Sequence, residues 1–152
     1  MDQPTHEQAK LQLELYELRR EARLRQARDW FFKNYFADSF EEAMRLGAPG
    51  TEAGTNVMMV ASYWDQACAM LNYGLLHEDL FFETNGEFYG VWHRVKPMAP
   101  GFREHFRNMQ FLALLQKAAE RFEAWMEKRS PGHIERMEEF MKQMRAQAQK
   151  AA

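Results

Sequence analysis

The stretch that decides the fold is TEAGTNVMMVASYWDQACAMLNYG, residues 51–74. Thr51 suits the start of a helix because its hydroxyl can accept a hydrogen bond from a free amide, and Gly74 suits the position just after a helix. Between them, apolar residues recur at helical spacing and form one wide face: Val57, Val60, Ala61, Trp64, Ala67, Cys68 and Leu71. Such a wide face is typical of a central helix that packs on more than one side.

Further helices are predicted on both sides of this stretch from the same signals. Their expected ranges are about 5–36, 39–46, 77–96 and 100–129, followed by a last helix that begins after Ser130 and Pro131. No alternating strand pattern bounded by hairpin turns is present. The sequence therefore predicts an all-α fold, a single compact domain of five or six helices over residues 1–152, with a long N-terminal helix and with residues 1–4 and 147–152 frayed.

Local details sharpen this expectation. Ser39 and Glu42 match a capping box, and Gly86 and Gly90 within the fourth helix indicate a kink or the close approach of another helix. The apolar stripe of the first helix changes face after Ala22, which indicates two partners or a bend. The predicted core comprises Trp64, Leu71, Phe81, Phe88, Trp92, Phe106, Leu112 and Leu115.

Composition excludes several classes of function. The net charge is −2, from 20 basic and 22 acidic residues, which gives no reason to expect nucleic acid as a partner. The longest apolar runs have about five residues, whereas a membrane-spanning helix needs about 20. A single cysteine fits a reducing compartment, and the first residues do not resemble a secretory signal. We therefore expect a cytoplasmic protein without a membrane partner.

The sequence contains no recognisable catalytic or metal-binding motif. No Glu-x-x-His motif of a helical di-iron site occurs, and Glu83 and Glu87, which could share a cation, are more typical of a solvated helix face. Cys68 lies in an apolar stripe, where a thiol is buried rather than reactive. The sequence predicts no catalytic residue, no metal ligand and no cofactor.

Two segments have features that also occur in nucleic-acid-binding proteins. Residues 40–59 have a helix-turn-helix outline, but the second helix would begin with Glu52 and without a basic residue. The basic run from Arg19 to Arg28 contains acidic residues at i,i+4 spacing, as expected for a solvated helix surface. Both features favour ordinary helical packing.

The segment from about Val60 to Arg103 resembles a family of small bacterial all-helical proteins known only as a domain of unknown function. The resemblance rests on Gly74 after a helix, on Trp92 in the next helix and on Arg103 beyond Pro97. Asp65 stands where that family usually has an acidic residue, commonly glutamate. The resemblance implies a compact helical fold and a bacterial origin, and it implies no activity.

Two functional hypotheses follow. The first is a non-enzymatic helical protein-interaction module that self-associates as a homodimer. The hypothesis rests on two apolar helix stripes that require a packing partner. They either pack on each other within the chain or dock on a second copy. The stripes are Leu11, Leu15, Leu18 and Ala22 near the start, and Ile134, Met137, Met141 and Met144 near the end.

The alternative is a small-molecule-binding or enzymatic protein with a pocket between the third, fourth and fifth predicted helices. Asp65, His93 and Arg103 are its candidate ligand-binding residues. Asp65 follows Trp64 on an otherwise apolar face, where a carboxylate needs a partner. We therefore expect Asp65 to be partly buried and paired with Arg103 or Arg94.

Overall fold

The computed structural model describes residues 2–151. Within this part of the chain every regular element is a helix, so the predicted all-α class is confirmed. The helices are α1 (His6–Arg19), α2 (Ala22–Asn34), α3 (Phe40–Leu46), α4 (Glu52–Asn72), α5 (Glu78–Thr84), α6 (Glu87–Val95), α7 (Ala99–His105), α8 (Ala113–Arg129) and α9 (His133–Ala151). The predicted number of five or six is wrong, because the described residues form nine helices.

The long N-terminal helix is divided at Glu21. The carboxylate of Glu21 accepts hydrogen bonds from the amides of Arg23 and Leu24, both at 2.9 Å, and so caps the start of α2. This hydrogen bonding holds the pKa of Glu21 below its ordinary value. The change of apolar face in the sequence therefore corresponds to a break between two helices, and the prediction of one long helix is wrong.

Two other predicted helices are also interrupted. The helix expected over 77–96 is divided at Asn85 and Gly86, and no atom outside the local backbone would lie within 4 Å of a Cβ at Gly86 or Gly90. Gly86 thus lies at a break between α5 and α6, whereas Gly90 lies within α6, and neither marks the close approach of another helix. The helix expected over 100–129 is interrupted between α7 and α8, where Arg107 and Leu112 take positive φ values of 52° and 54°.

Several predicted helix ends are confirmed. The Ser39 hydroxyl accepts a hydrogen bond from the amide of Glu42 at 3.2 Å, while the Glu42 carboxylate accepts from the amide of Asp38 rather than from that of Ser39. Thr51 caps α4 by accepting from the amide of Gly54 at 3.0 Å. Gly74 follows α4 with φ of 78°, a conformation that glycine adopts without the steric cost of a Cβ.

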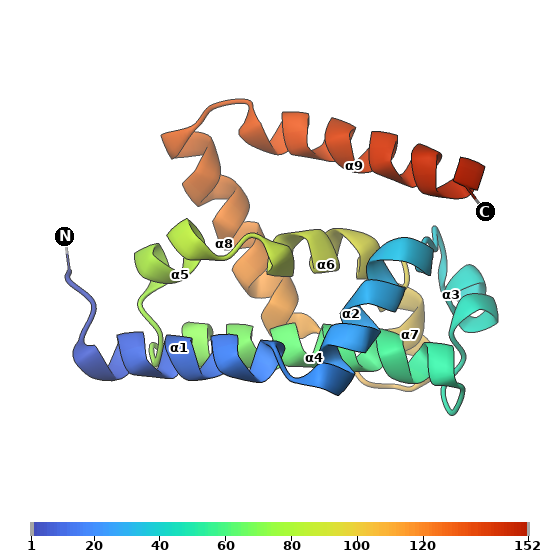
Figure 1. Ribbon diagram of the computed structural model, residues 1–152, viewed down its shortest axis with the longest axis horizontal. Coiled ribbons are helices and arrows are strands. Elements are labelled where there is room, and N and C mark those ends of the chain that lie inside the picture. Colours follow the sequence, from blue (N-terminus) through green and yellow to red (C-terminus); the bar gives the residue numbers. More distant parts are fainter. Residues whose placement is uncertain (1, 152) are drawn as a thin grey trace.

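Helix α4 packs against α2, α6 and α8, and in Figure 1 it runs along the lower part of the molecule, where α8 crosses it. Short helix α3 packs on α7 at one end, and α9 packs on α8. In Figure 1, α1 runs along the lower edge and α9 along the upper edge. The two apolar stripes predicted on α1 and α9 therefore do not cover each other within the chain.

The predicted core is confirmed except at one residue. Seven of the eight side chains are buried, and aromatic rings meet around Phe88, whose ring centroid lies 5.2 Å from those of Phe81 and Phe122. Phe106 is the exception, because it ends α7 and is 47% exposed. The interruption after α7 turns this ring outward onto Phe102, with centroids 4.5 Å apart.

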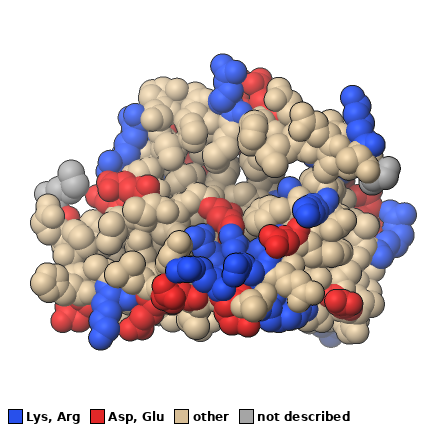
Figure 2. All heavy atoms as spheres, in the orientation of Figure 1, with Lys and Arg blue, Asp and Glu red and all other residues tan. Residues whose placement is uncertain are grey.

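On the surface, charged side chains of both signs are interspersed. Figure 2 shows basic side chains gathered over the region of α1 and α2 with acidic ones beside them, and the ion pairs Arg20–Glu17 and Arg28–Glu87 lie in this basic run. None of the helices in residues 2–151 has the length and apolar character needed to cross a bilayer. The predicted fraying of residues 1–4 and 147–152 includes positions 1 and 152, which lie outside the described residues; residues 147–151 continue α9.

Candidate functional site

An apolar cavity of about 210 Å³ lies where the end of α2 meets α3, α4 and α7. All its lining residues are apolar or aromatic: Tyr35, Ala43, Met44, Gly47, Pro49, Gly54, Val57, Met58, Met98, Phe102 and Phe106. A cavity of about 150 Å³ with such walls is known to stay dry and to hold a benzene molecule. The cavity is thus large enough for a single ring with a substituent.

The local sequence explains why space is left here. Gly54 in the first turn of α4 lies so close to the carbonyl of Ala48 that a Cβ would collide with it, and a Cβ on Gly101 would collide with the ring of Phe40. These close approaches fix the backbones of α3, α4 and α7. The space between them is then bounded by the small side chain of Ala43 and by three flexible methionines, which adapt to an irregular surface.

Tyr35 is the one lining residue with a hydroxyl group. Its side chain is only 1% exposed and stacks on Phe31 with ring centroids 5.2 Å apart. Its Oη atom is buried and has no hydrogen-bond partner among the described residues. Burial raises the pKa of this phenol, so the hydroxyl keeps its proton at neutral pH and can both donate and accept.

An unpartnered buried hydroxyl calls for an explanation, since nearly all buried polar groups in proteins have a partner. A phenylalanine at position 35 would retain the ring stacking without the cost of a buried hydroxyl. Five buried side-chain atoms lack a partner within residues 2–151, but only that of Tyr35 belongs to a residue in the wall of this cavity. The arrangement suits an apolar ligand with one polar atom.

Comparison with protein families identifies the chain. A family model described as "Domain of unknown function (DUF4760)" matches residues 4–122. The chain belongs to this DUF4760 family. The resemblance to a helical domain of unknown function is thereby confirmed, and it covers far more of the chain than residues 60–103. No curated protein and no solved structure matches the chain.

The DUF4760 match includes all residues that line the apolar cavity, because these run from Tyr35 to Phe106. Helix α9, residues His133–Ala151, lies beyond the matched range. The apolar cavity therefore lies within the part of the chain that the family model matches, whereas any site that involves α9 extends beyond it.

The three ligand-binding residues predicted from the sequence do not converge on this cavity. Asp65 is partly buried, as predicted, but its Oδ1 accepts a hydrogen bond from the amide of Leu115 at 2.9 Å, at the start of α8. The predicted ion pair with Arg103 or Arg94 is wrong, since no basic group of the described residues pairs with Asp65. Burial raises the pKa of Asp65, and the amides of Leu115 and Leu114 act in the opposite direction.

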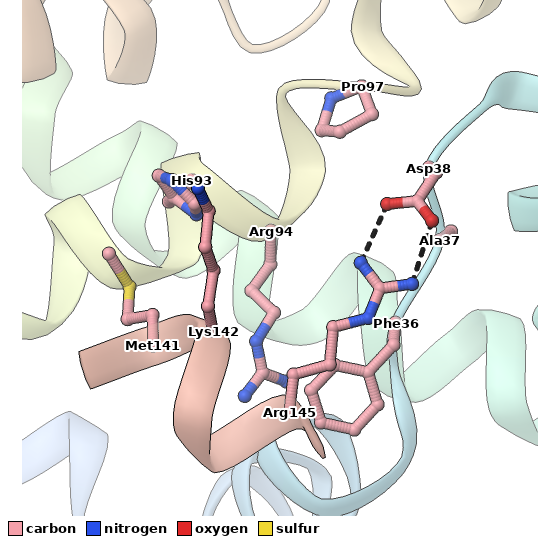
Figure 3. A pocket seen from close by; sticks show the side chains of 9 residues that line it. All are labelled: Phe36, Ala37, Asp38, His93, Arg94, Pro97, Met141, Lys142 and Arg145. Atoms are coloured by element: carbon pink, nitrogen blue, oxygen red, sulfur yellow. Dashed lines mark hydrogen bonds and ion pairs between the residues drawn. The ribbon is translucent and has the colours of Figure 1, made fainter. Parts of the chain in front are cut away.

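Arg103 and His93 lie elsewhere in the DUF4760 domain. Arg103 donates to the carbonyl of Phe111 and to the side-chain oxygen of Gln116, both at 2.8 Å, and so fastens the segment between α7 and α8. His93 on α6 lines a second cavity, under α9 (Figure 3). Asp65 and Arg103 line neither this cavity nor the apolar one.

The other chemical candidates have structural roles in the DUF4760 domain. Glu87 binds the guanidinium of Arg28 and accepts a hydrogen bond from the indole of Trp64 at 2.8 Å, whereas Glu83 pairs with Arg129. The two glutamates thus do not share a cation. Cys68 is buried, as predicted, and burial raises its pKa. No group of three or more His, Cys, Asp or Glu side chains in the described residues could hold a metal ion.

Sequence reasoning missed Tyr35 as a site residue. Tyr35 lies in the second apolar stripe of the predicted first helix, after the change of face, where a tyrosine is expected to serve as a packing side chain. The available signal was the hydroxyl itself, since a tyrosine within a buried stripe must find a hydrogen-bond partner.

Proposed function

We propose that this chain is a ligand-binding domain that holds a small, mainly apolar molecule in the cavity beside Tyr35. The observation that carries the proposal is the Tyr35 hydroxyl, which is buried, has no partner in the described residues and belongs to a residue that lines an apolar cavity of about 210 Å³. Apolar pockets with few polar groups are the usual form of small-molecule sites, the polar group fixing the orientation of the ligand.

Binding without catalysis fits the lining. The wall of this cavity contains no carboxylate, imidazole, thiol or amine that could transfer a proton or attack a substrate. The one titratable group, Tyr35, has a raised pKa and so does not supply a phenolate at neutral pH. A molecule in this cavity would therefore be held and released unchanged.

The experiment compares two probes of similar shape, ethylbenzene and acetophenone, the second of which has a carbonyl oxygen that can accept from Tyr35. We expect both to bind, with acetophenone favoured by about three- to tenfold, as one hydrogen bond of about 0.5–1.5 kcal/mol provides. In Tyr35→Phe this preference should disappear while ethylbenzene still binds. Dissociation constants can be measured by titration of amide shifts in NMR spectra.

A cavity-filling variant provides the control. Ala43→Leu adds carbon atoms into the cavity and should abolish binding of both probes without loss of helicity. Ala69→Leu makes the same change at a partly exposed position of α4 outside the cavity and should leave binding unchanged. No saturable binding to the unmodified chain, or equal binding to Ala43→Leu, would refute the proposal.

The self-associating protein-interaction module predicted from the sequence remains a second proposal. Its support is the set of exposed apolar side chains on α1 and α9, which includes Leu13, Leu18, Phe140 and Met144. A dimer formed through these helices is compatible with the cavity, because none of these residues lines it.

A further inference from the structure

A second cavity, of about 220 Å³, lies between the C-terminal half of α9 and the segments that follow α2 and end α6. Figure 3 shows that its wall comes from three parts of the chain: residues 36–38 after α2, residues 93–97 at the end of α6, and Met141, Lys142 and Arg145 of α9. In the space-filling view, the surface is hollowed below the upper edge, where α9 lies, and basic side chains border the hollow (Figure 2).

Arg94 is the innermost cation of this cavity. Its guanidinium donates to the carbonyls of Phe31, Phe32 and Tyr35 at 3.0–3.1 Å and so caps the end of α2. These bonds use three of its five N–H groups, which leaves two donors. Its charge lies 4.2 Å from the centre of the Phe36 ring and has no carboxylate partner in the described residues.

Helix α9 adds two more cations to the same cavity. Arg145 forms two hydrogen bonds to Asp38, of 2.6 and 2.7 Å. Lys142 is exposed and has no hydrogen bond or ion pair to a described residue, and in Figure 3 its chain extends across the ring of His93. The lining thus carries three permanent positive charges against the single negative charge of Asp38.

Burial is the main cause of the pKa shifts of Arg94 and His93, and neighbouring charges add to it. Burial, followed by the charge of Arg145, lowers the pKa of Arg94 to about 10, so the group stays charged at neutral pH. Burial also lowers the pKa of His93, with Lys96, Arg94 and Lys142 acting in the same direction and Glu138 opposing them. Capping of α2 explains the position of Arg94 and the ion pair with Asp38 explains that of Arg145, but neither explains the third cation, Lys142, in the wall of the same cavity.

We propose that this cavity is an anion site, built between the family domain and α9, that binds the phosphate group of a small phosphate monoester. The phosphate lies against Lys142 and His93, the charge of Arg94 adds to the attraction from the other end of the cavity, and the organic part of the ligand packs against Pro97 and Met141 (Figure 3). A doubly charged group suits the site because it offsets the excess charge, and clustered cationic donors are a common way to bind phosphate.

The site predicts a coupling between phosphate and protons. A bound dianion stabilises the imidazolium form of His93 and so raises its pKa. The affinity for the phosphate dianion should then be higher when His93 is protonated than when its imidazole is neutral. The charges that face His93 are those of Arg94 on α6, of Lys96 just after α6, and of Glu138 and Lys142 on α9.

The test compares phenyl phosphate with its two components, inorganic phosphate and phenol, each added alone. At about 0.01 M ionic strength, where screening extends over ~30 Å, phenyl phosphate should shift the His93 ring signals saturably and raise the pKa of His93. Inorganic phosphate should bind more weakly, and phenol should not shift these signals. Lys142→Gln should weaken phenyl phosphate binding at least threefold.

Lys117→Gln is the matched control, because it removes the same charge from an exposed position on α8. Its affinity should equal that of the unmodified chain, as should that of Ala43→Leu, in which the apolar cavity is filled. The proposal is overturned if His93 shows no saturable shift, or if Lys117→Gln weakens binding as much as Lys142→Gln does, since the effect would then be one of net charge.

Discussion

Helices α4 and α9 are of similar length, with 21 and 19 residues, and each has an apolar stripe in its sequence. Helix α4 nevertheless buries nine residues, whereas α9 buries none of its described residues. Helix α4 is packed between α2 and α8, while α9 packs mainly on α8 and is tied to the α2–α3 connection by the Arg145–Asp38 ion pair. The difference shows that an apolar stripe reveals which face of a helix packs, but not how much of that face is covered.

The two helices should therefore differ in stability. A region with many buried apolar contacts opens only with the whole fold, whereas a region with few can open locally at small cost. We expect α4 and its aromatic neighbours to unfold together, and α9 to open while the family domain stays folded.

The largest expected effect is on the free energy of unfolding, and one substitution in each region tests the contrast between α4 and α9. Phe88→Ala removes a fully buried ring that contacts Phe81 and Phe122, and it should reduce the free energy of unfolding by about 3–5 kcal/mol. Phe140→Ala on α9 removes a ring that is 57% exposed and should change it by less than about 0.5 kcal/mol. Urea unfolding followed by circular dichroism measures both. Similar losses would contradict the contrast.

A smaller effect is expected at Asp65, which joins α4 to the start of α8. Asp65→Ala leaves the amide of Leu115 without its acceptor and should cost about 1 kcal/mol, the usual value of a helix cap. Asp65→Asn keeps an acceptor oxygen at this place and should cost less at neutral pH. Equal losses in the two variants would show that the hydrogen bond is not what makes Asp65 stabilising.

Asp65 should also make the stability of the fold depend on pH. Because burial raises the pKa of Asp65, the folded chain holds this proton more firmly than the unfolded chain does. The stability that protonated Asp65 contributes is full below its unfolded pKa, about 3.9, and is lost as pH rises through the folded pKa. The unmodified chain should therefore lose stability relative to Asp65→Asn over that interval, which unfolding at several pH values can measure.

The attachment of α9 gives a third prediction, with a local effect. Asp38→Ala removes the partner of Arg145, and because Asp38 is largely exposed the global stability should change by less than about 1 kcal/mol. Amide hydrogen exchange in α9 should nevertheless become faster, while exchange in α4 stays the same. Faster exchange in both helices to the same extent would mean that α9 is part of the cooperative core.

Much of this fold could be predicted from the sequence, and the failures have physical reasons. The ends of α3 and α4 follow from Ser39, Thr51 and Gly74, because capping depends on residues within a few positions. The gap between α7 and α8 depends on left-handed conformations at Arg107 and Leu112, which no local preference of these residues indicates. Tertiary packing imposes these conformations, and for this reason the sequence wrongly predicts that Phe106 is buried.

The candidate sites were less predictable, because each depends on how helices cross. Helical spacing shows which residues share a face, but it does not show that Asp65 meets the start of α8 or that His93 meets Lys142 of α9. The sequence predicts a pocket between the third, fourth and fifth predicted helices, whereas the apolar cavity is lined from α3, α4 and α7 and has no lining residue from the fourth predicted helix, 77–96. Its polar group is Tyr35, which follows α2.

The smallest effect on folding is expected at Leu18, which tests self-association. Leu15 is not a suitable probe, since it is buried and the hydroxyl of Tyr63 donates to its carbonyl. Leu18 is 61% exposed, so Leu18→Glu should alter stability by less than about 0.5 kcal/mol. If the exposed side of α1 joins two copies, light scattering should give a mass above 18.1 kDa for the unmodified chain and a single-chain mass for Leu18→Glu. Leu46→Glu, at an exposed leucine of α3, should leave the dimer intact. A mass of one chain at every concentration would reject the dimer, and a dimer that survives Leu18→Glu would place its interface away from α1, with the uncovered stripe of α9 as the next surface to alter.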